Sequence, residues 1–282
     1  MLTEMKLSYD GHSIFYRVIG NGRPVVLLHG FGEDGNVWKN QVELLSERFQ
    51  LIVPDLPGSG QSEMIADMSM EGMAEVVRSI VDAELSKLII GNERPAKVFM
   101  IGHSMGGYVS LAFAEKYRDY LSGFGLFHST AYADSEEKKA TRRKGIQFIN
   151  QHGAFEFLKT SSYNLFSQIS KNKTPRLIDE FIGGLHNFKP EALVSYYEAM
   201  INRPDRVNVL KNLSVPVLFI AGKYDNAVPL NDVLEQCHLP EISYFHVLAE
   251  SGHMGMIEEA EKSNNILNDY LLNLSSFNPN LY

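Results

Sequence analysis

A serine flanked by glycines is the residue of this chain whose setting points most directly to chemistry. Residues 102–106, GHSMG, fit the pattern G-x-S-x-G and stand between the apolar run 98–101 and a helix-like run. A serine on a sharp strand-to-helix turn has strained backbone angles, and glycine neighbours keep side chains from colliding with the turn. The hydroxyl then lies at a helix N-terminus, whose N–H groups favour a developing negative charge. We predict that Ser104 is a nucleophile, with a chance glycine–serine loop as the alternative.

A base must remove the proton of a serine hydroxyl before it becomes a good nucleophile, and histidine usually supplies that base. The chain contains nine histidines. His253 follows the last strand-like run and precedes the last helix-like run, so its loop can turn the imidazole inward. We predict His253 as the general base. His29 and His103 flank glycine turns and are predicted to make local hydrogen bonds.

An acidic residue should orient the imidazole and stabilise its cation. Asp225 follows the apolar run 215–221, at the carboxyl end of a predicted strand, where the sites of parallel sheets gather. We therefore predict Asp225 as this acid, with a turn or helix-capping role as the alternative. Asp134, which follows the run 121–127, is the rival acid.

Two turns could supply backbone amides that stabilise an oxyanion. The segment 29–32, HGFG, ends another strand-like run, and the N–H of Phe31 can point toward Ser104. The N–H of Met105 would be the second donor, so we predict these two amides as an oxyanion hole. The segment 55–60, DLPGSG, lacks the Lys-Ser/Thr ending of a phosphate-binding loop, and we interpret it as a structural turn.

The elements that would position these residues alternate between short apolar runs and helix-like runs. Strands are predicted at 13–19, 24–28, 50–53, 97–101, 121–127, 215–221 and 242–247. Helices are predicted at 70–88, 105–117, 136–151, 190–201 and 258–272. Continuous apolar strands separated by helices predict an α/β protein with a mostly parallel sheet covered on both faces.

The alternation stops in the middle of the chain. Between about residues 129 and 205 we find only helix-like stretches, with glycine helix stops at 153 and 183–184. We therefore predict an α/β core built from residues 1–128 and 206–282, interrupted by a helical cap at 129–205.

Composition disfavours several classes of protein. The chain has 282 residues, 44% hydrophobic and 21% charged, and its formal net charge of −8 disfavours nucleic acids and anionic membranes as partners. No apolar run approaches the roughly 20 residues that span a bilayer. A single cysteine, Cys237, excludes an intrachain disulfide and a cysteine zinc cluster, and we predict no metal site. Without a signal-peptide pattern the expected location is cytoplasmic, although one thiol also suits export.

Together these motifs resemble the α/β-hydrolase superfamily. The features that carry the resemblance are the order Ser104, Asp225, His253 and the segments 29–32, 55–60 and 102–107. The resemblance covers most of the chain outside the insertion. It implies the α/β-hydrolase fold, with about eight strands and a helical cap over the site, and it implies no cofactor. The implied activity is that of a serine hydrolase that cleaves a small carboxylic ester through an acyl-enzyme.

Departures from the patterns of the superfamily narrow this expectation. Haloalkane dehalogenases and epoxide hydrolases carry aspartate at the position of Ser104, so their reactions are not expected. Carbon–carbon bond hydrolases that degrade aromatic rings usually have asparagine and tryptophan where this chain has His103 and Met254. The chain remains similar to carboxylesterases and cofactor-free haloperoxidase-like enzymes. Carbon–carbon bond hydrolysis, perhydrolysis and a small-molecule receptor on the same fold are the alternatives.

The predicted cap carries two groups of residues that could contact a substrate. Aromatic side chains could form the wall of a pocket for an apolar or aromatic acyl group, although packing between helices is their commoner role. These are Phe148, Phe155, Phe157, Tyr163, Phe166, Phe181, Phe188, Tyr196 and Tyr197. A basic cluster could meet an anionic substrate, although a solvated helix face is more common. Its members are Lys138, Lys139, Arg142, Arg143 and Lys144.

Overall fold

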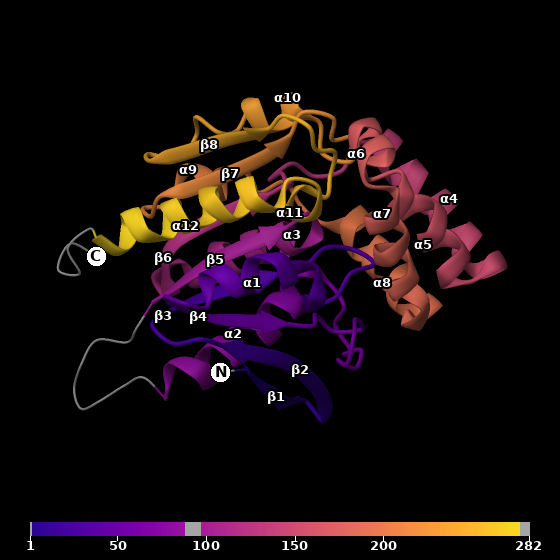
Figure 1. Cartoon of the computed structure of the whole chain (residues 1–282). Helices are drawn as coiled ribbons and strands as arrows, with labels where there is room; N and C mark the ends of the chain where they lie inside the picture. The colour runs from indigo at the N-terminus through magenta and orange to yellow at the C-terminus, as the bar shows by residue number, and fades with distance from the viewer. Residues whose placement is uncertain (1, 88–96, 277–282) are drawn as a thin grey trace.

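One eight-stranded sheet forms the centre of the molecule (Figure 1). The structure is a computed structural model that describes residues 2–87 and 97–276. Its strands are β1 (Leu2–Tyr9), β2 (His12–Ile19), β3 (Arg23–Leu28), β4 (Phe49–Pro54), β5 (Val98–His103), β6 (Leu121–Phe127), β7 (Val217–Gly222) and β8 (Ser243–Leu248). They lie in the order β1-β2-β4-β3-β5-β6-β7-β8. The pairs β1–β2 and β2–β4 are antiparallel, and the other pairs are parallel.

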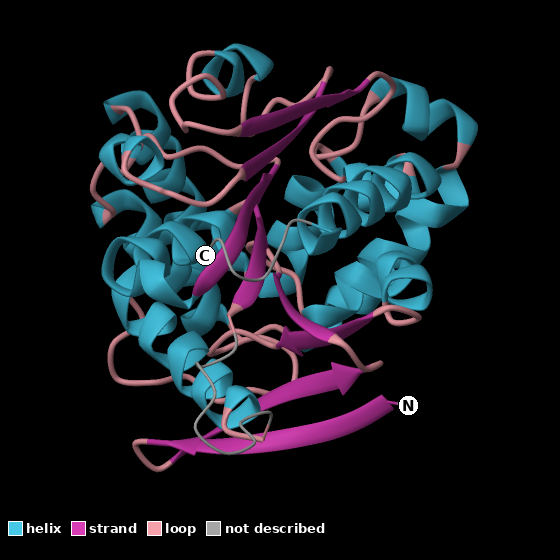
Figure 2. Cartoon of the chain, turned by 90° about the vertical axis from the view of Figure 1, so that its left-hand side faces the viewer, coloured by secondary structure: helices cyan, strands magenta, loops and turns pink. Residues whose placement is uncertain are grey.

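Both faces of the sheet are buried, because alternate residues of a central strand point to opposite sides. In β3, Val26 and Leu28 belong to one apolar core, whereas Val25 and Leu27 belong to the other. Burying each such side chain contributes about 1.5–3 kcal/mol. The continuous apolar strand therefore requires a layer of helices on each face, and Figure 2 shows helices on both sides of the sheet.

Each core is closed by its own helices. Outside residues 129–205, the α-helices with buried residues in the Val26 core are α2 (Met70–Leu85), α3 (Met105–Tyr117), α9 (Val207–Lys211) and α10 (Leu230–Leu234). Those with buried residues in the Val25 core are α1 (Lys39–Leu45), α11 (Gly255–Glu258) and α12 (Ala260–Ser276). The short helices η1 (Gly35–Trp38) and η2 (Arg118–Tyr120) precede α1 and β6. No helix in the described ranges is long and apolar enough to cross a membrane.

The chain between β6 and β7 forms a group of helices at one end of the sheet. They are α4 (Glu136–His152), α5 (Ala154–Tyr163), α6 (Gln168–Lys173), α7 (Pro175–Gly183), η3 (Gly184–Asn187) and α8 (Pro190–Asn202). Figure 1 shows them on the right, at the end of the sheet away from the chain termini. Their boundaries follow local sequence: the Ser135 hydroxyl accepts the N–H of Lys138, and Gly153 separates α4 from α5 at φ 88°. We call α4 to α8 the inserted helices.

The predicted mostly parallel sheet of about eight strands, flanked by helices, is confirmed, with differences in detail. Strand β1 was not predicted, although its residues pair with β2 along their whole length. The helix predicted at 258–272 is confirmed as α12, which begins two residues later because the backbone of Glu259 leaves the helical region at φ −126° and ψ 56°. The predicted helix 70–88 ends at Leu85, and residue 88 lies outside the described residues.

Candidate active site

Ser104 lies on a sharp turn between β5 and α3. Its backbone has φ 49° and ψ −116°, which residues other than glycine rarely adopt. A Cβ atom on Gly102 would overlap the backbone of Gly106, and one on Gly106 would overlap the carbonyl group of His29. Close backbone packing therefore requires glycine at both positions. The turn leaves Ser104 half-buried at the N-terminus of α3.

The segment that follows β3 passes directly beside the serine. A Cβ atom on Gly30 would lie 3.2 Å from the Cβ of Ser104. Within the described part of the chain, neither the Phe31 N–H nor the Met105 N–H donates a hydrogen bond. Met105 is the first residue of α3, where backbone amides have no acceptor inside the helix. Both amides are thus free to donate to an oxyanion next to Ser104.

Asp225 and His253 are in direct contact. Asp225 follows β7, and its Oδ2 lies 2.8 Å from Nδ1 of His253 in the loop after β8. Its Oδ1 accepts the N–H groups of Ala227 and Val228, each at 2.8 Å. Burial raises the pKa of Asp225, but the neighbouring histidines outweigh burial and hold it well below its usual range. The carboxylate is therefore ionised and fixes the direction of the His253 ring.

The pKa of His253 is shifted in the direction that a partner carboxylate produces. Burial alone lowers the pKa of this imidazole, because the charged form loses hydration. The negative charge of Asp225 and its hydrogen bond outweigh burial, so the pKa of His253 lies above its ordinary value of 6.5. The neutral ring can accept a proton at Nε2, and the resulting imidazolium is stabilised by Asp225.

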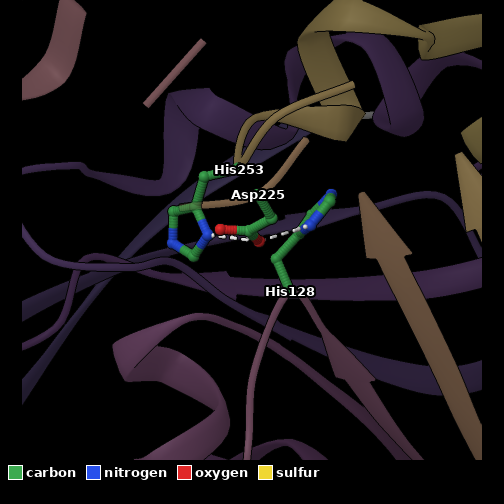
Figure 3. Close-up of side chains that lie close together, drawn as sticks. All are labelled: His128, Asp225 and His253. Carbon is green, nitrogen blue, oxygen red and sulfur yellow. Dashed lines mark hydrogen bonds and ion pairs between the residues drawn. The ribbon is translucent and has the colours of Figure 1, made fainter. Parts of the chain in front are cut away.

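A second imidazole contacts the same carboxylate oxygen. Nδ1 of His128 lies 3.0 Å from Oδ2 of Asp225, and Figure 3 shows the carboxylate between the two rings. His128 follows β6 with φ 49° and is fully buried. Burial lowers the pKa of His128 to about 4 and outweighs the opposing effect of Asp225. His128 is thus neutral near pH 7 and carries one ring proton.

The neighbours of His128 determine which nitrogen carries that proton. Nε2 lies 3.2 Å from the N–H of Gly255, so it must accept. Nδ1 then carries the proton and donates to Asp225. The N–H of Gly222 also points at Nδ1 from 3.1 Å, but placing the proton on Nε2 instead would lose both other hydrogen bonds. We assign the Nδ1–H form, so Oδ2 of Asp225 accepts from two histidines.

His103 connects the turn at Ser104 with the loop of His253. Its Nε2 lies 3.0 Å from the carbonyl oxygen of His253, which can only accept. Its Nδ1 lies 2.9 Å from Oε2 of Glu33, and that oxygen also accepts the Gly30 N–H at 2.7 Å. Burial raises the pKa of Glu33, but the charge of His103 outweighs burial and lowers it. The buried pair of Glu33 and His103 therefore connects the segment after β3, the turn at Ser104 and the loop of His253. The prediction that His103 makes only local hydrogen bonds is wrong.

The loop that carries His253 is held from both sides. Oε1 of Glu258 accepts the N–H groups of Gly252 and Met254, on either side of His253, at 2.9 and 3.1 Å. The His253 N–H donates to the carbonyl oxygen of Leu165, 2.7 Å away, in the segment between α5 and α6. The inserted helices thus help to position the imidazole.

Asp134, the rival acid, lies in a different cluster. It forms ion pairs with Arg142 at 2.5 Å and with Arg203 at 2.9 Å. The contact with Arg142 holds the pKa of Asp134 below its usual value against the effect of burial. The structure therefore brings Asp225, not Asp134, to His253.

The aromatic residues of the inserted helices divide by location. Phe31 stacks on Tyr197 with ring centroids 4.4 Å apart, and its edge meets Phe157 at 6.3 Å. These three rings therefore lie beside the Ser104 turn. In contrast, Phe148 and Tyr163 are 40% and 44% exposed. The other members pack within the inserted helices or against the core, as helix-packing residues do.

The segment 55–60 has the contacts of a structural turn. Oδ1 of Asp55 accepts the Gly35 N–H at 3.0 Å, and its Oδ2 accepts the Gln61 N–H at 3.0 Å. His29 donates from Nδ1 to the Gly30 carbonyl and accepts the Leu56 N–H at Nε2, 2.8 Å away. This turn therefore supports the segment beside Ser104.

One group of described residues has the composition of a metal site: His128, Asp225 and His253, whose potential ligand atoms lie within 4.8 Å of one another. All three are buried. Their hydrogen bonds to Asp225 require a proton on Nδ1 of each ring, and a protonated ring nitrogen cannot bind a metal. The donor set is therefore better suited to holding protons than to holding a metal ion.

Sequence reasoning missed Glu33 and His128. Each had a positional signal: Glu33 follows the segment HGFG directly, and His128 follows β6 at the carboxyl end of a parallel strand. Their roles depend on partners 70 and 97 residues away along the chain, which no local pattern reveals.

Known proteins resemble this chain in both sequence and fold. The sequence model of the alpha/beta hydrolase fold family matches residues 23–129. A pimeloyl-[acyl-carrier protein] methyl ester esterase of Vibrio cholerae is 24% identical over 88% of this chain and 94% of its own. A 2-hydroxy-6-oxononadienedioate/2-hydroxy-6-oxononatrienedioate hydrolase of Paraburkholderia phymatum is 25% identical over 92% of this chain and 90% of its own.

A solved structure extends the similarity over nearly the whole chain. A thermophilic esterase from Thermogutta terrifontis superposes with a TM-score of 0.87 at 29% identity, covering 96% of this chain and 99% of its own. The superposed part of this chain includes the inserted helices as well as the sheet. With the eight-stranded sheet and the turn at Ser104, these similarities show that the chain belongs to the α/β-hydrolase superfamily.

Proposed function

We propose that this chain is a serine hydrolase that cleaves small carboxylic esters through an acyl-enzyme. The observation that carries the proposal is the contact of 2.8 Å between Asp225 Oδ2 and His253 Nδ1. The loop of His253 is linked to the strained turn of Ser104 by the neighbouring His103, whose Nε2 lies 3.0 Å from the His253 carbonyl oxygen. The names of two similar proteins, the esterases of V. cholerae and T. terrifontis, support ester bonds as the target.

The proposed reaction has two steps. Nε2 of His253 takes the hydroxyl proton while Oγ of Ser104 attacks the ester carbonyl carbon. The Phe31 and Met105 amides stabilise the oxyanion, and the alcohol leaves with the proton from His253. Water then loses a proton to His253 and attacks the acyl-enzyme, which releases the acid and restores the Ser104 hydroxyl.

We further propose that residues 129–205 act as a cap over the core formed by 1–128 and 206–282. Phe157 and Tyr197 support this role, because their rings contact Phe31 beside the proposed oxyanion amides. Rings at this position favour an ester whose acyl part is apolar or aromatic next to the carbonyl.

A covalent label tests the nucleophile. An aryl organophosphonate should give one stoichiometric adduct, which peptide mass spectrometry should locate on Ser104. Ser104→Ala should fold normally and lose turnover on the order of 10⁶-fold, as in the best-studied serine enzyme. An adduct on another residue, or an alanine variant that retains most activity, would contradict the mechanism.

The same assay separates the alternatives. A protein that labels at Ser104 but cleaves a ring-fission dienoate faster than any aryl ester would be a carbon–carbon bond hydrolase. A folded protein that neither labels nor turns over esters, yet is stabilised by a small ligand, would be a receptor.

A further inference from the structure

A buried carboxylate just before α4 is surrounded by more positive charge than it neutralises. Asp134 lies between Arg142, whose Nε is 2.5 Å from Oδ2, and Arg203, whose Nη2 is 2.9 Å from Oδ1. The side chains of Asp134 and Arg203 are 0% and 3% exposed. Two guanidinium groups and one carboxylate leave this arginine cluster with a net charge of +1. Buried charges are normally paired, so the cluster lacks one anion.

The hydrogen bonds of the cluster show where an anion could bind. Arg142 uses Nε and Nη2 on Asp134, and its Nη1 has no partner among the described residues. This Nη1 atom is not fully enclosed by protein, and 19% of the Arg142 side chain is exposed. Arg203 is different, because its Nη1 and Nη2 donate to the carbonyl oxygens of Met200 and Tyr132. The accessible donor of the cluster is therefore Nη1 of Arg142.

Arg142 differs from the other basic residues of α4. Lys138 approaches Asp232 at 3.6 Å and Lys139 approaches Glu136 at 2.9 Å, so each is paired near the surface. Arg143 and Lys144 are exposed. Arg142 instead faces inward, on the same side of α4 as the buried Gly145.

Two short series of contacts connect the cluster with the turn at Ser104. The Arg142 guanidinium lies over the ring of Tyr197 at 5.4 Å, and that ring stacks on Phe31 at 4.4 Å. On the other side, the Arg203 guanidinium lies 3.8 Å from the ring centroid of Tyr108, one turn of α3 beyond Ser104. The cluster is thus one layer of side chains from the proposed oxyanion amide and from the nucleophile.

We propose that Arg142 binds a carboxylate of the substrate at the end remote from the scissile ester, so that the enzyme prefers monoanionic esters. This inference rests on the proposed function and adds a charged end to the apolar part that Phe157 and Tyr197 contact. Asp134 holds the guanidinium in place, and the substrate anion supplies the charge that the cluster lacks. A hydrogen bond between charged groups is favoured here because only 19% of the Arg142 side chain is exposed, so water screens the interaction less than at an open surface.

Two pairs of esters of matched shape test the preference. One pair is the mono-4-nitrophenyl ester of adipic acid against 4-nitrophenyl hexanoate, which places the carboxylate on the acyl part. The other is 3-acetoxybenzoate against 3-tolyl acetate, which places it on the alcohol part. We expect the charged ester to have the higher kcat/KM in at least one pair. The pair that shows the preference identifies which side of the ester faces Arg142.

Substitutions then assign the preference to one residue. Arg142→Gln should lower the charged-to-neutral ratio of kcat/KM by about 10- to 100-fold, mainly through KM, as expected for a hydrogen bond between charged groups. Arg142→Lys should retain part of the ratio. Arg143→Gln, the matched control, removes the same charge from the exposed neighbour and should leave the ratio as it is. A ratio that responds equally to both glutamine variants would mean general electrostatics and overturn the assignment.

A binding measurement separates this inference from the proposed function. Calorimetry with adipate on the Ser104→Ala protein should show binding that Arg142→Gln weakens about 10-fold or more and Arg143→Gln does not. If this holds while the wild-type protein cleaves no ester, the proposed function falls and the anion site remains. If esters are cleaved without charge preference and adipate does not bind, the inference falls and the hydrolase remains.

Discussion

Nδ1 of His128 lies 3.0 Å from Oδ2 of Asp225, the oxygen that also contacts His253. Because His128 is neutral and donates from Nδ1, it withdraws part of the carboxylate charge from His253. Asp225 raises the pKa of His253, and we expect the second donor to limit that rise. His128 is a positioning residue in this arrangement, since it acts on the proposed base only through Asp225.

Removing that donor should move the pH profile. In His128→Ala the whole charge of Oδ2 acts on His253, so the acidic limb of kcat/KM should shift upward by roughly 0.5–1 pH unit. That is the size expected from losing one hydrogen bond of about 0.5–1.5 kcal/mol. The measurement is the pH dependence of kcat/KM on a neutral aryl ester.

His128→Asn is the matched control. Asparagine tolerates the backbone at φ 49° and offers an amide N–H near the position of Nδ1, so its profile should stay closer to that of the wild type. If both variants lose activity without any shift of the limb, His128 has only a structural role.

The wild-type profile should itself show a raised histidine pKa. His253 must be neutral to take the serine proton, and Asp225 holds the pKa of His253 above 6.5. Activity should therefore be present above that pKa and be lost as the pH falls through it, with the acidic limb above pH 6.5. A kcat/KM that stays flat down to pH 4 would argue against histidine as the base.

The two candidate acids should respond differently to the same substitution. Asp225→Asn removes the partner that orients His253, and turnover should fall about 10⁴-fold, as in a serine protease. Asp134→Asn leaves two buried guanidinium groups without a carboxylate and should cost about 3–5 kcal/mol of stability. Thermal unfolding and single-turnover kinetics distinguish the two effects. The reverse pattern would make Asp134 the acid.

Aromatic residues beside the turn should matter more for specificity than those at the surface. Phe157→Leu and Tyr197→Leu change rings that contact Phe31, so they should alter the preference among acyl chain lengths. Phe148→Leu and Tyr163→Leu change exposed rings and serve as controls. The test is a set of kcat/KM values from acetyl to octanoyl esters, and identical sets for all four variants would assign the inner rings to packing alone.

Local patterns in the sequence determined most of the fold. The apolar strands and their order predict the parallel sheet, and the glycines around Ser104 predict the strand-turn-helix, because backbone sterics and burial act over a few residues. Strand β1 escaped prediction, since its mostly exposed residues carry little burial signal and depend on pairing with β2.

Only the tertiary structure decided which charged and titratable groups meet. The sequence offered Asp225 and Asp134 as acids for His253, and the folded chain gives one to the histidine and the other to two arginines. It also brings His128 to Asp225 and Glu33 to His103 across long stretches of chain. These contacts depend on distances of a few ångströms between side chains from different strands and loops. Electrostatic energy and pKa depend on those distances and on burial, neither of which a residue's neighbours in sequence specify.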